Sequence, residues 1–226
     1  MRSNERGVSD MKKLICGLAA AAICISTAIG VSAEGETSKI KFGVANKITD
    51  SGYEVTVHMI SDFACAGVEG SVMSLMSYNG SNLSEEIAAK NDAVSSIKAN
   101  PSGMIKFSLL GDVKNGTVGC WNEFSFKERD TVADSSCVAV DIKSVEINSS
   151  GVNKSTASEV FVYGDANADN KIDIRDLINV KKRLAKIEVP GNEAAADCSG
   201  DGDVTTDDLV LLRKFLIGVK GTSLGK

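Results

Sequence analysis

The stretch Asp165-Ala-Asn-Ala-Asp-Asn-Lys-Ile-Asp-Ile-Arg-Asp176 decides the fold of the C-terminal part of this chain. It carries oxygen-bearing side chains at positions 1, 3, 5, 9 and 12, and a second stretch from Asp197 to Asp208 repeats that spacing. Calcium takes about six to eight oxygen ligands, and a single short loop with this spacing can wrap the ion. The two stretches therefore predict two calcium-binding loops.

Each predicted loop offers side-chain oxygens and one backbone carbonyl, because position 7 contributes only its main chain. Position 6 needs a sharp turn with positive φ, which Gly202 adopts freely and Asn170 tolerates. Position 12 is Asp in both loops, where the helix-loop-helix calcium motif has Glu. The predicted calcium ligands are Asp165, Asn167, Asp169, Lys171, Asp173 and Asp176 in the first loop, and Asp197, Ser199, Asp201, Asp203, Thr205 and Asp208 in the second.

The residues after each loop predict a helix. Apolar residues follow at the three- and four-residue spacing that places them on one side of a helix. The pattern recurs after 32 residues, which indicates a repeat and not two unrelated acidic turns. Before the first loop, residues 159–163 alternate as a strand does, and before the second, residues 192–196 allow one helical turn. The helical positions are Leu177, Val180 and Leu184, and then Leu209, Leu212 and Leu216.

Residues 163–220 resemble a type I dockerin domain, in which each repeat is a calcium loop followed by a single helix. The resemblance implies two bound calcium ions and a protein partner, the cohesin module of a scaffoldin. Dockerin–cohesin binding assembles cellulosomes and related polysaccharide-degrading complexes. The resemblance therefore implies that this protein is a component of such a complex.

The resemblance also places the positions that contact a cohesin, which are loop positions 10 and 11 and a basic pair further along the helix. Well-known dockerins often carry Ser-Thr at positions 10 and 11, and their near-identical repeats allow two binding orientations. Here the two repeats differ at positions 10 and 11, so we expect one preferred binding orientation. For the basic pairs, the alternative to a partner contact is a solvated helix face. The positions are Ile174, Arg175, Lys181 and Lys182 in the first repeat, and Thr206, Asp207, Arg213 and Lys214 in the second.

The N-terminal segment predicts secretion. A basic pair precedes an apolar run from Leu14 to Val31, and Val31-Ser-Ala33 supplies a cleavage site of small residues. We expect residues 1–33 to be a signal peptide, and the mature protein to be extracellular or part of a cell-surface complex without a membrane attachment of its own. A membrane anchor is the alternative, because the run is nearly long enough to span a bilayer. The polar residues before Met11 leave either Met1 or Met11 as the initiator.

The net charge and the cysteines of the sequence bear on its possible partners, metal sites and disulfides. The formal net charge is −5, and no basic cluster is interleaved with aromatic residues, so we expect no nucleic-acid partner. The sequence has no pair of cysteines at CxxC spacing, the spacing that would indicate a zinc site. Four cysteines follow the predicted signal peptide: Cys65, Cys120, Cys137 and Cys198. Their spacing does not fix any disulfide pairing, and buried thiols are an equal alternative.

Residues 35–162 predict an antiparallel β-sandwich or jelly roll, and residues 221–226 a short tail. Short alternating runs separated by Gly and Asn turns are typical of these folds. Residues 84–97 allow a short helix or irregular loop, and residues 148–158 a linker or hairpin. The alternating runs are Tyr53–Met59, Met104–Leu109, Phe124–Lys127 and Cys137–Ile142.

Through four of its segments, this sandwich region resembles a cohesin domain of the carbohydrate-binding superfamily. The resemblance leaves three roles open: an adaptor cohesin that receives another dockerin, a module that holds polysaccharide, or a structural domain without a ligand. Trp121 has the strand parity of Glu123 and Ser125, opposite to Phe124 and Phe126, which makes it a candidate outward-facing ligand anchor. The alternative is a Trp tucked under a loop at the start of the strand. We expect His58 to face solvent. No carboxylate pair stands out, and we expect no enzyme activity. The segments are Tyr53–Val57, Gly67–Met73, Gly103–Phe107 and Gly116–Lys127.

Overall fold

The computed structural model describes residues 39–89, 93–112, 116–147, 153–154 and 157–225. The predicted signal peptide lies outside the described residues. Among the helices of the described residues, none is long and apolar enough to cross a membrane.

The described residues form both strands and short helices. The strands are β1 (Lys39–Ile48), β2 (Tyr53–Cys65), β3 (Gly67–Ser74), β4 (Tyr78–Leu83), β5 (Val94–Ala99), β6 (Met104–Leu110), β7 (Thr117–Arg129), β8 (Val138–Glu146), β9 (Asn153–Lys154), β10 (Ala157–Val162) and β11 (Ser223–Leu224). The helices are α2 (Glu85–Ala88), α3 (Ile174–Leu184), α4 (Glu193–Ala196) and α5 (Thr206–Leu216), with a 3-10 turn η1 (Ser135–Cys137).

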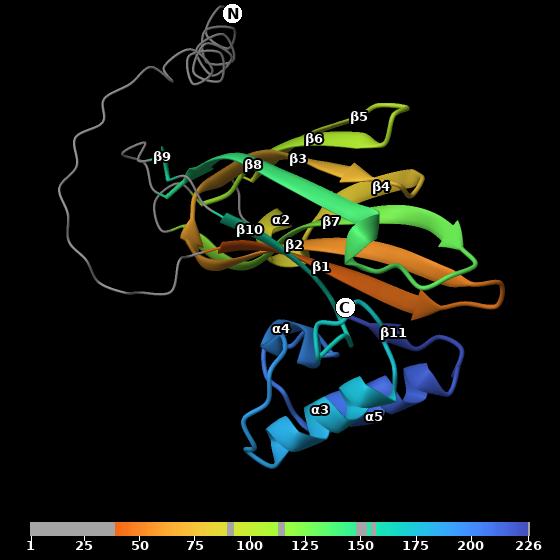
Figure 1. Cartoon of the computed structure of the whole chain (residues 1–226). Helices are drawn as coiled ribbons and strands as arrows, with labels where there is room; N and C mark the ends of the chain where they lie inside the picture. The colour runs from red at the N-terminus through yellow and green to blue at the C-terminus, as the bar shows by residue number, and fades with distance from the viewer. Residues whose placement is uncertain (1–38, 90–92, 113–115, 148–152, 155–156, 226) are drawn as a thin grey trace, which may run out of the picture. The chain divides into compact units, whose positions relative to one another are not determined.

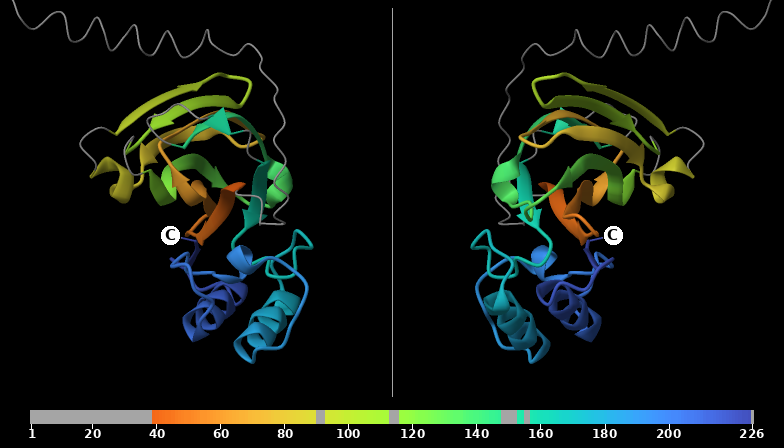
Figure 2. Two further views of the ribbon diagram at one scale, coloured as in Figure 1. Left: turned by 90° about the vertical axis from the view of Figure 1, so that its left-hand side faces the viewer. Right: turned by 90° about the vertical axis from the view of Figure 1, so that its right-hand side faces the viewer.

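The strands form two sheets packed face to face, which confirms the predicted sandwich (Figures 1 and 2). Sheet A has the order β10-β1-β2-β7-β4, with β11 also paired to β1, and sheet B has the order β5-β6-β3-β8-β9. Only the β1–β10 pair is parallel among the described strand pairs. The ring of Phe107 in sheet B lies between Phe42 and Phe124 of sheet A, at centroid distances of 6.3 and 5.6 Å. Apolar residues from alternate strand positions therefore fill one core between the sheets.

Two ambiguous regions of the sequence acquire definite structure. Residues 84–97 contain the short helix α2 and then strand β5, which continues sheet B. Between residues 148 and 158, strand β9 pairs antiparallel with β8, which agrees with the hairpin alternative.

Of the two alternatives for Trp121, the outward-facing ligand anchor is wrong, because its side chain is fully buried in the core. Met59 on β2 pairs with Asn122 on β7, but Ile60 pairs with Cys120, so Trp121 is an extra residue in β7. Such a β-bulge places two successive side chains on the same face of the sheet and reverses the alternation before it. A regular alternation counted back from Phe124 and Phe126 leaves out this bulge. It therefore places Trp121 on the wrong face of β7.

We expect Trp121→Ala to destabilise the sandwich by about 3–5 kcal/mol, the usual cost of removing a buried aromatic ring. The ring packs closely, since a Cβ atom on Gly111 would lie 2.9 Å from its Cη2 atom. Urea unfolding followed by circular dichroism in saturating calcium measures the change. Val118→Ala is the control, because Val118 is an exposed residue of the same strand, and should change stability by less than about 0.5 kcal/mol. Similar stabilities for the two variants would contradict the core role of Trp121.

The prediction that His58 faces solvent is also wrong. Its side chain does point to the outer face of sheet A, but only 4% of the residue is exposed. Tyr163, just after β10, covers it with an edge-on ring whose centroid is 6.0 Å away. Burial lowers the pKa of His58 to about 4, so its ring is neutral at neutral pH.

The C-terminal residues are held to the sandwich. Strand β11 pairs antiparallel with β1, where Asn46 lies opposite Leu224, and Leu224 is fully buried. Thr222 accepts a backbone hydrogen bond from Ile48 at 2.8 Å. Within the predicted tail, residues 221–226, Ser223–Leu224 thus add a strand to sheet A, and residue 226 lies outside the described residues.

Candidate calcium and partner-binding site

The two predicted calcium loops fold alike, beginning with the carboxylate at position 1. In each loop this carboxylate accepts hydrogen bonds from the backbone N–H groups of positions 5 and 6, which curls the loop around it. The bonds run from Asp169 to Asp165 (3.0 Å), from Asn170 to Asp165 (2.8 Å), from Asp201 to Asp197 (3.2 Å) and from Gly202 to Asp197 (2.8 Å).

The carboxylate at position 12 closes each loop. It accepts backbone hydrogen bonds from positions 3 and 9, and position 9 is also the N-cap of the following helix in a capping box. The same residues therefore shape the loop and start the helix. The bonds run from Asn167 to Asp176 (3.1 Å), from Asp173 to Asp176 (2.8 Å), from Ser199 to Asp208 (2.8 Å) and from Thr205 to Asp208 (2.7 Å).

The loops also share two left-handed turns. Position 6 has positive φ in both, 63° at Asn170 and 102° at Gly202, as their residue types predicted. Position 4 has positive φ as well, 60° at Ala168 and 71° at Gly200. This second turn was not predicted, because Ala168 gives no sequence signal for it; Gly200 alone does.

Four carboxylates of the loops are buried, namely Asp165, Asp176, Asp197 and Asp208. Among the described residues, no Lys or Arg forms an ion pair with any of them. Burial raises the pKa of Asp176 to about 6 and also raises that of Asp165. Buried carboxylates are normally paired or bound to a metal, so an oxygen-binding cation such as calcium fits these loops.

Arg175 contacts the first loop directly. Its guanidinium lies 2.9 Å from Asp169 and 2.6 Å from Asp173, two predicted calcium ligands. Hydrogen bonds from Arg175 hold the pKa of Asp173 below its usual value. This side chain, predicted to contact a partner, is therefore also placed to share loop oxygens with the ion.

The predicted partner residues are brought together as two matching stripes. Ile174 begins α3 and is 60% exposed, and Thr206 begins α5 in the equivalent place and is exposed. The basic pairs follow two turns later on each helix, and all four residues are exposed. Helical spacing places the start and the basic pair on one side of each helix.

Three exposed apolar residues of these helices were missed in the sequence. Ile178 on α3 is 48% exposed, and Val210 on α5, 32 residues later, is 50% exposed. Ile217, just after α5, is 70% exposed. The signal for Ile178 and Val210 was available, because each interrupts the polar side of its helix between the loop and the basic pair. Each stripe thus combines apolar and basic groups, which is typical of a protein-binding surface.

Comparisons with known proteins give one family match and several structural neighbours. A search of curated proteins finds no match to the sequence. Among solved structures, a non-cellulosomal cohesin from the archaeon Archaeoglobus fulgidus has 10% identity and a TM-score of 0.40, covering 55% of this chain and 91% of that one. A type II cohesin–X-dockerin complex from Acetivibrio cellulolyticus has 10% identity and a TM-score of 0.41, covering 55% and 95%. The second type II cohesin module of the cellulosomal adaptor scaffoldin ScaA of Acetivibrio cellulolyticus has 11% identity and a TM-score of 0.35, covering 56% and 95%.

The C-terminal repeats match a protein-family model directly. The model is the dockerin type I domain, and the match covers residues 163–217. It includes both loops and both helices described above. Residues 163–217, called the dockerin segment below, are therefore similar to type I dockerin domains, which confirms the resemblance predicted from the loop spacing.

Proposed function

We propose that this protein is a secreted, non-catalytic component of a cellulosome-like complex, attached to a scaffoldin by calcium-dependent binding of its dockerin segment to a cohesin module. The observation that carries the proposal is the pair of matching exposed stripes, each joined to an acidic loop by a shared capping residue. One calcium ion in each loop would balance the buried carboxylates and fix the start of each helix. The ion therefore sets the shape of the surface offered to the cohesin.

We further propose that the sandwich is an adaptor cohesin, which receives a dockerin of another protein. The supporting feature is the outer face of sheet B, where strand register places small and charged side chains in rows across four strands. Most of these side chains are exposed. One row is Lys98, Lys106, Ser71 and Asp141, and the next is Ser96, Ser108, Glu69 and Ser144.

The distribution of aromatic residues favours a protein ligand over polysaccharide. Sugar-binding faces stack planar rings on the sugar. Every Trp, Tyr and Phe of the sequence lies within the described residues, and none is exposed. Trp121, the candidate sugar anchor, is buried in the core.

Binding of purified ligands to the full-length protein tests the adaptor role. We expect at least one protein from a panel of purified dockerin proteins to bind in calcium, and insoluble cellulose, xylan and pectin not to bind. Ser71→Arg places a bulky charge at the centre of sheet B and should abolish binding. The control Val118→Arg makes a similar change on an exposed position of sheet A and should preserve it. Retention on a polysaccharide, or dockerin binding equally weakened by both variants, would contradict the adaptor role.

A further inference from the structure

The β-bulge that buries Trp121 has a second effect on the outer face of sheet A. His58 on β2 lies opposite Glu123 on β7, and Ile60 lies opposite Cys120. Residues 58 and 60 share a face of β2, so their partners share a face of β7. Without the bulge, Cys120 and Glu123 would lie on opposite faces. The extra residue therefore places a thiol, a carboxylate and an imidazole side by side.

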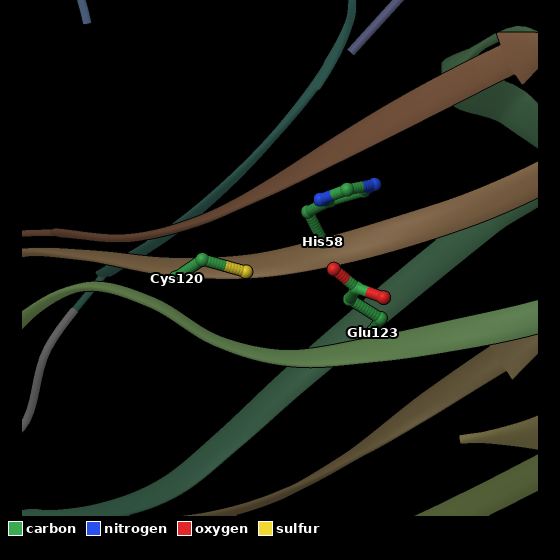
Figure 3. A group of neighbouring side chains, drawn as sticks. All are labelled: His58, Cys120 and Glu123. Atoms are coloured by element: carbon green, nitrogen blue, oxygen red, sulfur yellow. The ribbon is translucent and has the colours of Figure 1, made fainter. Parts of the chain in front are cut away.

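The three side chains converge within metal-binding distance. One ligand atom from each of His58, Cys120 and Glu123 lies within 4.8 Å of the other two, and Figure 3 shows the side chains gathered between β2 and β7. His58 is buried, while Cys120 and Glu123 are half-buried. Among the described residues, the buried Nε2 atom of His58 has no hydrogen-bond partner. A buried ring nitrogen without a partner is uncommon, and it needs an explanation.

We propose that His58, Cys120 and Glu123 bind a divalent transition metal, with Zn²⁺ as the best fit. Imidazole nitrogen, thiolate sulfur and carboxylate oxygen are the donors that zinc takes in proteins, and three protein ligands leave one position for solvent. The thiol of Cys120 would release its proton to solvent on binding. The calcium loops offer oxygen donors instead, so the two kinds of site select different ions.

The location of the group indicates what a bound metal would do. The ring of Tyr163, the first residue of the dockerin segment, lies edge-on against His58. Tyr163 in turn packs against Phe161 on β10, with ring centroids 5.0 Å apart. A metal that fixes the His58 ring would therefore stabilise the junction between the sandwich and the dockerin segment. The role of the ion would be to stabilise this junction, and this role does not depend on the proposed partners.

Cobalt binding to the full-length protein, with its thiols kept reduced and calcium saturating, tests the site. Co²⁺ replaces Zn²⁺ in such sites and reports a thiolate ligand by its intense near-ultraviolet charge-transfer band. We expect one Co²⁺ with this band in the wild type, displaced by Zn²⁺. Cys120→Ala should remove the band, and Glu123→Gln should weaken Zn²⁺ binding at least about tenfold. Zn²⁺ should also raise the melting temperature of the wild type but not of Cys120→Ala.

Cys198→Ala is the matched control, because Cys198 is a buried thiol that lies within the second acidic loop, outside the group of His58, Cys120 and Glu123. It should keep the cobalt band unchanged. Circular dichroism confirms that each variant is folded before metal is added. Absence of the band in the wild type, its persistence in Cys120→Ala, or its loss in Cys198→Ala would overturn the proposal.

Discussion

Removal of calcium with a chelator is expected to unfold the dockerin segment and leave the sandwich folded. Helices α3 and α5 have 11 residues each, a length at which isolated helices are marginal in water. Their loops contain buried carboxylates that repel one another without a cation. Calcium at about 1,000 times its Kd would stabilise the folded form by about 4 kcal/mol per site. Circular dichroism should show reversible loss of the helical signal and persistence of the β signal. A spectrum that does not change when the chelator is added would contradict the calcium dependence of the fold.

The two loops are expected to differ in affinity. The first offers four ligand carboxylates and the second three, with Ser199 and Thr205 as neutral oxygens, so the second loop should bind calcium more weakly. In calorimetry, Asp176→Ala should remove the tighter binding step and Asp208→Ala the weaker one. Asp203→Ala is the control, because position 7 contributes its backbone carbonyl. Equal loss of affinity in the two ligand variants would contradict the ranking.

One repeat is expected to dominate scaffoldin binding. Ile174 and Arg175 offer an apolar contact and a guanidinium, whereas Thr206 and Asp207 offer a hydroxyl and a negative charge. These pairs cannot make equal contacts with one cohesin surface. The double variant Ile174→Asp, Arg175→Asp should lose at least about 30-fold in affinity, as expected for an interface hot spot of about 2 kcal/mol or more. Thr206→Asp, Asp207→Arg should lose less than tenfold, measured by surface plasmon resonance on an array of cohesin modules.

The ion pairs of Arg175 with the first loop require a separate control for this prediction. Replacing Arg175 also removes a cation from Asp169 and Asp173, so calcium affinity must be measured on each variant. The single variant Ile174→Asp leaves these pairs intact and should reproduce most of the loss. Wild-type binding by both double variants, with failure only of the quadruple variant, would instead indicate two interchangeable orientations.

The fold of the two acidic loops could be predicted from sequence because its determinants are local. The turn at position 6 and the helix that follows are both encoded within a short segment, and the structure reproduces them. The calcium ligands stay a prediction. The alternation of β2 and β6 likewise gave their buried faces, since side chains in a strand alternate regardless of distant residues.

The failed predictions depended on contacts between distant parts of the chain. The alternation of β7 was correct at Phe124 but failed at Trp121, because a bulge appears only when the strand is paired with its neighbour. His58 was assigned to the correct face, but Tyr163 covers that face from more than 100 residues away. Ser223–Leu224 is a strand of only two residues, too short to show a pattern in the sequence from which its pairing with β1 could be predicted.

The parallel pairing of β1 with β10 determines how a pulling force would act on the protein. Lys39 at the start of β1 lies opposite Ala157, and Val44 lies opposite Val162, which leads directly into the dockerin segment. Tension between the start of β1 and a scaffold-bound dockerin segment would pull these two strands lengthwise in opposite directions. Their evenly spaced hydrogen bonds would then bear the load together and not break one after another. The parallel pairing of β1 with β10 therefore suits this junction to resist mechanical shear.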